Sequence, residues 1–354
     1  MAFRTFFDLL PVLLLFALGA ALRATRVLDR DTIAGIKRLV VNLTLPVLLF
    51  DAFFRLQPDL RNLFLVVAVF LACVLMIFGG RLASRALRLD GPYAPLMFEG
   101  FEAGMLGYAL FLGIAGDANL PYFAASDLGQ VLFVFSILQA QLRSRETGAR
   151  GLKVIVRGFV SSPVVVAIAA GLLIGSLLRA LAGLGSTGVA AFIAASAGAS
   201  AGSGAASGAG SGAASGTGSG AGDALTVVFA SFWRLAAIVK ALTMPLICFV
   251  IGADIELDRK NISFALRLVA GRIVTLGLLA FVVGYLFAVR LLGLPPIYGF
   301  AVLVLFLLPP PFVIPVFMLK GDEAEGKRVA TTLSLHSLAS ILVIGLAAVV
   351  LAPR

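Results

Sequence analysis

The sequence predicts an all-α polytopic membrane protein, and its composition, the length of its apolar runs and a repeated motif support this fold class. Of the 354 residues, 60% are hydrophobic and only 13% are charged, whereas soluble domains are about 45–50% apolar and about 25% charged. Many apolar runs reach about 20 residues, the length at which a helix crosses about 30 Å of hydrocarbon. The alternating pattern of a transmembrane β-strand is absent from the sequence.

The charged and sulfur-containing residues exclude several other classes of function. The net charge of +10 agrees with Lys and Arg in cytoplasmic loops, so we expect no nucleic-acid partner. Cys73 and Cys248 lie in apolar runs of different spans, which predicts buried side chains and neither a disulfide nor a metal site. The sequence has no metal-ligand spacing and no Gly-rich nucleotide loop with Lys. We therefore expect a protein that is not an enzyme and holds no cofactor.

Hydropathy predicts ten membrane spans, of which the first lacks the small-residue cleavage site of a signal peptide. They cover roughly residues 6–24, 35–55, 62–84, 93–115, 120–142, 158–180, 226–253, 264–290, 296–319 and 328–352. The loops after the odd-numbered spans hold 20 of the 28 Lys and Arg, if Arg267 and Arg272 are counted with the loop after 226–253. This bias predicts an inner (cell) membrane protein with both termini outside.

One segment between these spans differs in kind. Residues 183–224 are rich in Ala, Gly and Ser and have no charge before Asp223. Such a composition cannot bury a core, so it predicts a flexible tether on the outer side. We therefore divide the chain into a first unit at 1–142, a cytoplasmic loop at 143–157 and a second unit at 158–354, which the tether interrupts.

A repeated motif relates the two units to each other. "LTLPVLLF" at 43–50 and "LTMPLICF" at 242–249 are 199 positions apart, and the segments from Tyr93 to Asp117 and from Tyr298 to Asp322 are 205 apart. The nearly equal offsets predict that a unit of five helices is duplicated in the sequence. Because five is odd, the second copy must cross the membrane in the opposite direction, as in the inverted repeats of secondary transporters.

Four stretches resemble the auxin efflux carrier family, within the bile acid and auxin carrier superfamily. They are "TIAGIKRLVVNLTLPVLLFDAFFRL" in the second span, "EGFEAGMLGYALFLGIAGD" in the fourth, "VRGFVSSPVVVAIAAGLLIG" in the sixth and "LPPPFVIPVFMLKGDEAEG" in the ninth. The resemblance implies a scaffold of spans 1, 2, 6 and 7, and a moving unit of spans 3–5 and 8–10. It also implies broken helices 4 and 9 that cross at the binding site, and small organic anions as substrates.

On this resemblance the substrate would bind at the two helix breaks. Glu102, Gly104 and Gly107 lie at the first break, and Pro309 and Pro315 at the second. There the free amides and the positive dipole end of a half-helix would face the anion. The chain departs from the family pattern because Glu102 stands at an Asn position and Ala109 at the position of the crossover proline. A carboxylic acid at this point opens a proton-linked mechanism.

Ionisable residues inside predicted spans need an explanation, because they are costly in hydrocarbon. Glu102 lies one helical turn from Glu99, and two carboxylates this close disfavour double ionisation. Lys240 could hold a substrate carboxylate or pair with Glu102. Asp127 matches a polar position of the family, and His336 is the only histidine, which suits either hydrogen-bonded packing or a proton relay. Glu99, Glu102, Asp127 and His336 are thus the candidates for ion coupling.

One further charge pair is expected from spacing alone. Asp51 precedes Arg55 by four residues near the outer end of the second span. Side chains at this spacing meet on a helix surface, so the sequence predicts a local ion pair without a role in transport.

The sequence as a whole predicts a secondary active transporter that moves a small organic anion, a mono- or dicarboxylate, by an elevator-type movement. Two alternatives stay open: a sodium-coupled symporter of the bile-acid type and a transport-inactive membrane sensor. The coupling ion could be a proton or sodium. The partners are the substrate and the lipid bilayer, and a homodimer is left open.

Overall fold

The computed structural model describes residues 2–57, 59–147, 162–183, 221–318 and 323–351, and every regular element in these ranges is helical. The predicted cytoplasmic loop at 143–157 and the predicted tether at 183–224 lie largely outside the described residues. The principal helices are α1 (Ala2–Ala24), α2 (Arg30–Leu39), α3 (Leu45–Arg55), α4 (Leu60–Ala86), α5 (Tyr108–Ala115), α6 (Leu120–Phe133), α7 (Gln139–Thr147), α9 (Pro163–Gly183), α11 (Ala221–Ala253), α12 (Ile262–Ala280), α13 (Pro296–Phe306) and α14 (Glu323–Leu351).

Eight helical segments in the described ranges are long and apolar enough to cross a membrane. They correspond to eight of the ten predicted spans. The other two predicted spans, 6–24 and 296–319, coincide with shorter apolar helices at Leu10–Ala24 and Pro296–Phe306. The fold class is therefore confirmed as a multi-pass helical membrane protein, while the number ten and the inverted repeat stay predictions.

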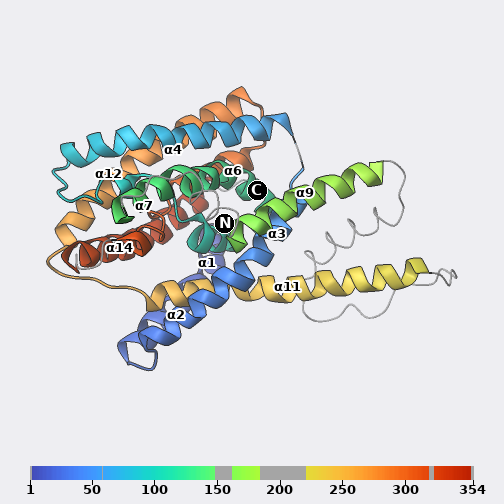
Figure 1. Cartoon of the computed structure of the whole chain (residues 1–354), viewed down its shortest axis with the longest axis horizontal. Coiled ribbons are helices and arrows are strands. Elements are labelled where there is room, and N and C mark those ends of the chain that lie inside the picture. The colour runs from blue at the N-terminus through green and yellow to red at the C-terminus, as the bar shows by residue number, and fades with distance from the viewer. Residues whose placement is uncertain (1, 58, 148–161, 184–220, 319–322, 352–354) are drawn as a thin grey trace.

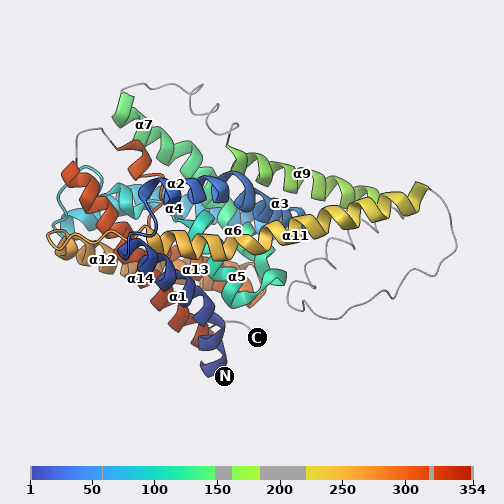
Figure 2. The ribbon, with the colours of Figure 1, turned by 90° about the horizontal axis from the view of Figure 1, so that it is seen from below.

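The helices form two groups with different packing partners (Figure 1). In the first, α3 packs along α9 and α1 along α11, with α2 beside α11. In the second, α4 packs on α6, α13 on α6, and α12 on α14. Figure 2 shows α11 running past both groups and α1 lying close to α14. We call these the α1–α3–α9–α11 group and the α4–α7/α12–α14 group.

Small residues allow the closest helix contact of the first group. A Cβ atom added to Gly19 in α1 would lie 2.0 Å from the carbonyl oxygen of Phe249, and one added to Gly252 in α11 would lie 2.0 Å from that of Phe16. Only glycine fits at this distance. Close backbone approach through small residues is a common way for helices to associate in a membrane, where burial of apolar surface gives little driving force.

The repeated motif lies in the core, where its two copies meet. The first copy lies in a π-helical turn at Val40–Thr44 and the start of α3, and the second lies within α11 around Pro245. The hydroxyl of Thr243 donates to the carbonyl of Thr44 at 3.2 Å, and both side chains are buried. The two copies therefore pack against each other, although they are far apart in the sequence.

Two helices are broken inside the second group, as the sequence predicts. The chain is non-helical at residues 99–102, where Gly100 has a φ of +68°, before the π-helical turn Ala103–Gly107 leads into α5. It is non-helical again after α13, because the three prolines at 309–311 lack amide donors and disfavour helix in the preceding residue.

The two breaks touch each other. The amide of Glu102 donates to the carbonyl of Pro309 at 2.9 Å, and the rings of Phe101 and Phe306 lie 4.6 Å apart. We call this contact between residues 99–104 and 306–315 the crossover.

Candidate functional site

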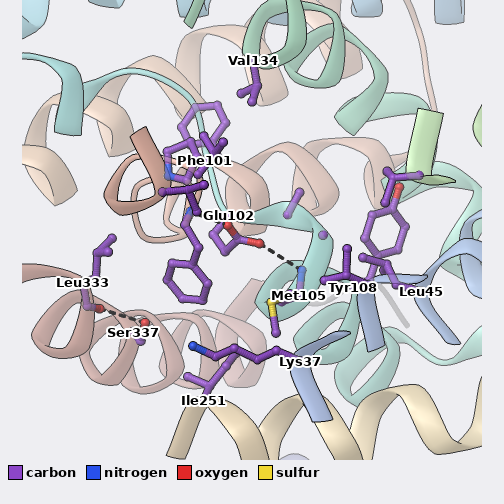
Figure 3. Close-up of a pocket in the computed structure, with 18 of the residues that line it drawn as sticks. Lys37, Leu45, Phe101, Glu102, Met105, Tyr108, Val134, Ile251, Leu333 and Ser337 are labelled. Carbon is purple, nitrogen blue, oxygen red and sulfur yellow. Dashed lines mark hydrogen bonds between the residues drawn. The ribbon is translucent and has the colours of Figure 1, made fainter. Parts of the chain in front are cut away.

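A cavity of about 660 Å³ lies against the crossover, and both helix groups line it. The first group contributes side chains of α2, α3 and α9 and the end of α11, and the second contributes both breaks, α6 and α14 (Figure 3). Most of these side chains are apolar, among them Leu45, Val134 and Phe312. A cavity of this size suits a small organic molecule.

Glu102 connects the two breaks through its carboxylate. Its Oε1 accepts a hydrogen bond from the Met105 amide at 3.1 Å (Figure 3). Its Oε2 accepts one from the Phe312 amide at 2.6 Å. The first bond caps the helical segment that runs from Ala103 to Ala115, where a carboxylate is favoured by the free amides and the helix dipole. Glu102 thus uses amides of both breaks, the kind of donor that the family resemblance assigns to the substrate anion.

The four other expected crossover residues divide into two pairs. Gly104 and Pro315 line the cavity. Gly107 and Pro309 are not among its described lining residues. Gly107 packs so closely that an added Cβ would lie 2.6 Å from Leu308, and the Pro309 carbonyl holds the Glu102 amide. Gly107 and Pro309 therefore support the packing of the crossover, whereas Gly104 and Pro315 could contact a bound molecule.

Asp127 on α6 also lines this cavity. The hydroxyl of Tyr108 donates to its Oδ2 at 3.2 Å, while its Oδ1 is buried and has no hydrogen-bond partner among the residues that the structure describes. Gln130, one turn further along α6, donates to the carbonyl of Phe101. The side chain of Asp127 therefore brings an unused acceptor to the cavity wall.

The structure places the other two candidates for ion coupling away from the cavity. Glu99 is buried and accepts a hydrogen bond from the Gln141 amide group at 2.9 Å. His336 lies 3.1 Å from the hydroxyl of Ser340, which itself donates to the carbonyl of Leu307 at 2.7 Å. His336 and Ser340 thus fasten α14 to the second break, which favours the packing interpretation of this histidine.

Lys240 lies in a buried charge cluster and is not among the described residues that line the cavity. Its Nζ is 2.6 Å from Asp51 and 2.8 Å from Asp117. Arg55 is 2.7 Å from Asp51 and 3.2 Å from Asp117. The predicted Asp51–Arg55 pair is confirmed, but it is half of a four-membered cluster with two positive and two negative charges. The partners of Lys240 are these two aspartates and not Glu102, because α11 packs beside α3 and α5 at this level.

Arg272 lies at the crossover, although sequence reasoning placed it in a loop. It was counted with a cytoplasmic loop, yet its side chain is fully buried in α12. It donates to the carbonyl of Met97 at 2.6 Å, to that of Gly100, and to that of Leu308 at 3.4 Å. These carbonyls come from both broken segments. Its position well inside an apolar helix was the signal that could have identified it.

The charged side chains that line the described cavity are mostly acidic. Four are carboxylic acids, namely Glu102, Asp127, Asp254 and Glu256, and one is basic, Lys37. Lys37 is 2.6 Å from Asp254, in a pair whose side chains are 36% and 52% exposed. This partly open pair marks the mouth of the cavity. Glu256 is exposed as well, whereas Glu102 is half-buried and Asp127 is buried.

Comparison with known families agrees with this architecture. Residues 5–156 match the model of a family described as "Membrane transport protein". This stretch contains the first five predicted spans and the first break with Glu102, and the family is the one that the four motifs resemble. No curated protein matches the chain. This match and the eight membrane-length helices in the described ranges support a multi-pass membrane transport protein.

Proposed function

We propose that the protein is a secondary carrier whose solute binds in the cavity at the crossover. The observation that carries this proposal is the opened backbone: two broken helices meet at the wall of an apolar cavity that both helix groups line. Irregular backbone at membrane depth is tolerated where it lines a cavity or is buried in protein. Discontinuous helices that meet in mid-membrane are the usual substrate sites of secondary transporters.

The movement that we propose is an elevator-type shift of the α4–α7/α12–α14 group along the α1–α3–α9–α11 group. The packing supports this division, since the most extensive contacts lie within each group. The contact between Thr44 and Thr243 supports an inverted repeat, because equivalent positions of two such copies are expected to face each other. The charge bias of the loops supports both termini outside the cell membrane.

The substrate class has two candidates. A small organic anion is favoured by the resemblance and by the two amides at the crossover, which could hold a carboxylate if Glu102 moved away. A solute of another charge is favoured by the acidic lining. Glu102 and Asp127 are the groups that could couple transport to a proton or sodium, because they line the cavity and lie at membrane depth.

Solute movement in proteoliposomes tests the carrier function. We expect the purified full chain to exchange at least one labelled organic acid or base from a panel across the membrane, with a rate that depends on a proton or a sodium gradient. Liposomes without protein give the background of passive permeation. A membrane sensor would bind a solute from the panel and leave its movement at this background, and that result would contradict a carrier.

A further inference from the structure

The basic side chains around the described crossover are already paired, and none is left to attract an anion. Lys240 and Arg55 share Asp51 and Asp117. The Arg272 guanidinium donates hydrogen bonds to backbone carbonyls of both broken segments.

The one basic side chain in the described lining is also engaged. Lys37 lies at the cavity mouth, 2.6 Å from Asp254. A bound carboxylate would therefore have to compete with a protein carboxylate or carbonyl for every nearby positive charge.

The amide donors of the crossover are occupied as well. The Glu102 carboxylate accepts hydrogen bonds from the Met105 and Phe312 amides. Because this carboxylate belongs to the protein, it cannot diffuse away from these donors. An organic anion entering the cavity would have to displace this carboxylate. It would then face both Glu102 and Asp127, and repulsion between like charges is strong where water is excluded.

In contrast, one hydrogen-bond acceptor in the cavity wall has no donor among the described residues. Asp127 is 2% exposed, lines the cavity, and has no partner for its Oδ1 among the described residues. A buried acceptor without a partner costs free energy unless a donor reaches it. The apolar wall around it, with Leu45, Val134 and Phe135, suits the body of an organic molecule but offers no donor.

We propose that this cavity selects an organic cation: an ammonium or similar donor group that reaches Asp127 and Glu102, attached to an apolar body. This inference rests on the proposed carrier function for its biological meaning, but it concerns the charge of the ligand alone. Glu102 takes the position of the substrate anion, and a cation completes the charge balance of the site.

A set of three probes with one shared body tests this selection. The probes are 1-naphthylmethylammonium, 1-naphthoate and the neutral 1-naphthylmethanol, and binding to the full chain in lipid nanodiscs is measured against empty nanodiscs. We expect the cation to bind at least about tenfold more tightly than the anion, since one charge-assisted hydrogen bond in a buried site is worth about ten- to a hundredfold in affinity. The alcohol should lie between the two.

Two variants identify the responsible side chains. Glu102→Gln and Asp127→Asn should each weaken binding of the cation about tenfold or more and reduce its advantage over naphthoate. Asp127→Asn keeps an oxygen for the Tyr108 hydroxyl, so the fold should survive. Glu323→Gln removes the same charge from an exposed position at the start of α14 and should leave all three affinities unchanged.

The outcomes separate this inference from the carrier function. Naphthoate binding as tightly as the cation, the same preference in both variants, or no binding of any probe to the folded protein would each overturn the cation site. Cation binding without movement in proteoliposomes would uphold the site and contradict the carrier. Transport of naphthoate in preference to the ammonium probe would uphold the carrier and contradict the cation site.

Discussion

Arg272→Met is expected to produce the largest loss of stability of any single substitution at the crossover. The change leaves the carbonyls of Met97, Gly100 and Leu308 buried without this donor. Each hydrogen bond to a charged group contributes about 1.5–3 kcal/mol, so the loss should reach several kcal/mol even if the three are not additive. We expect a melting temperature lower by about 10 °C or more in detergent, measured by fluorescence-detected size-exclusion chromatography after heating.

Two further substitutions show whether geometry or charge is responsible. Arg272→Lys keeps the charge but not the planar fork that reaches several carbonyls, so it should restore only part of the stability. Arg267→Met removes from the same helix an exposed arginine whose hydrogen bonds to the carbonyls of Leu87 and Arg88 are open to solvent, and should change the melting temperature little. An Arg272→Met protein that melts with the parent would show that Arg272 does not hold the two broken segments together.

The buried charge cluster gives the second large effect. Lys240→Met leaves Asp51 and Asp117 with only Arg55, and removal of one partner of a buried pair costs about 3–5 kcal/mol. We therefore expect Lys240→Met to destabilise the protein strongly. Lys260→Met, at an exposed position, should have little effect.

A double substitution separates this structural role from substrate binding. Lys240→Met combined with Asp117→Asn restores the balance of charge, with Arg55 facing Asp51, and should recover a large part of the melting temperature. If Lys240 instead held the substrate, the single change would leave stability intact and lower only the binding affinity. If the double variant lost as much stability as the two single variants together, Lys240 and Asp117 would not interact, and this would also contradict the cluster.

The family resemblance located the two breaks, and spacing along one helix located one ion pair. Three consecutive prolines end α13 whatever their surroundings. Asp51 and Arg55 meet because a helix places residues four apart on one side. The acidic residue at position 102 was recognised because a carboxylate at membrane depth requires a partner.

The partners across helices could not be obtained in this way. Whether Lys240 faces Glu102 or Asp51 depends on how α11 is rotated and on which helix lies beside it, and neither follows from the order of residues in α11. Arg272 was missed for a related reason. Counting it with a loop satisfied the charge bias, and only the packed structure brings the carbonyls of both broken segments to its guanidinium.

If solute passes through the cavity at the crossover, a bulky group attached inside that cavity should stop transport. A Cβ added to Gly104 would meet only Leu45 and Glu102, at 3.5 and 3.7 Å, so Gly104→Cys should fold and place a thiol in the cavity. The native cysteines, Cys73 and Cys248, are buried and can be replaced by Ala. Gly35→Cys, in open space on an exposed part of α2, is the matched control.

The measurement is the flux of a solute that the parent transports, before and after complete labelling of each cysteine variant with a bulky maleimide in proteoliposomes. We expect labelling at position 104 to abolish the flux, excess solute to slow that labelling, and labelling at position 35 to leave the flux unchanged. Undiminished flux through protein fully labelled at position 104 would show that the solute takes another path.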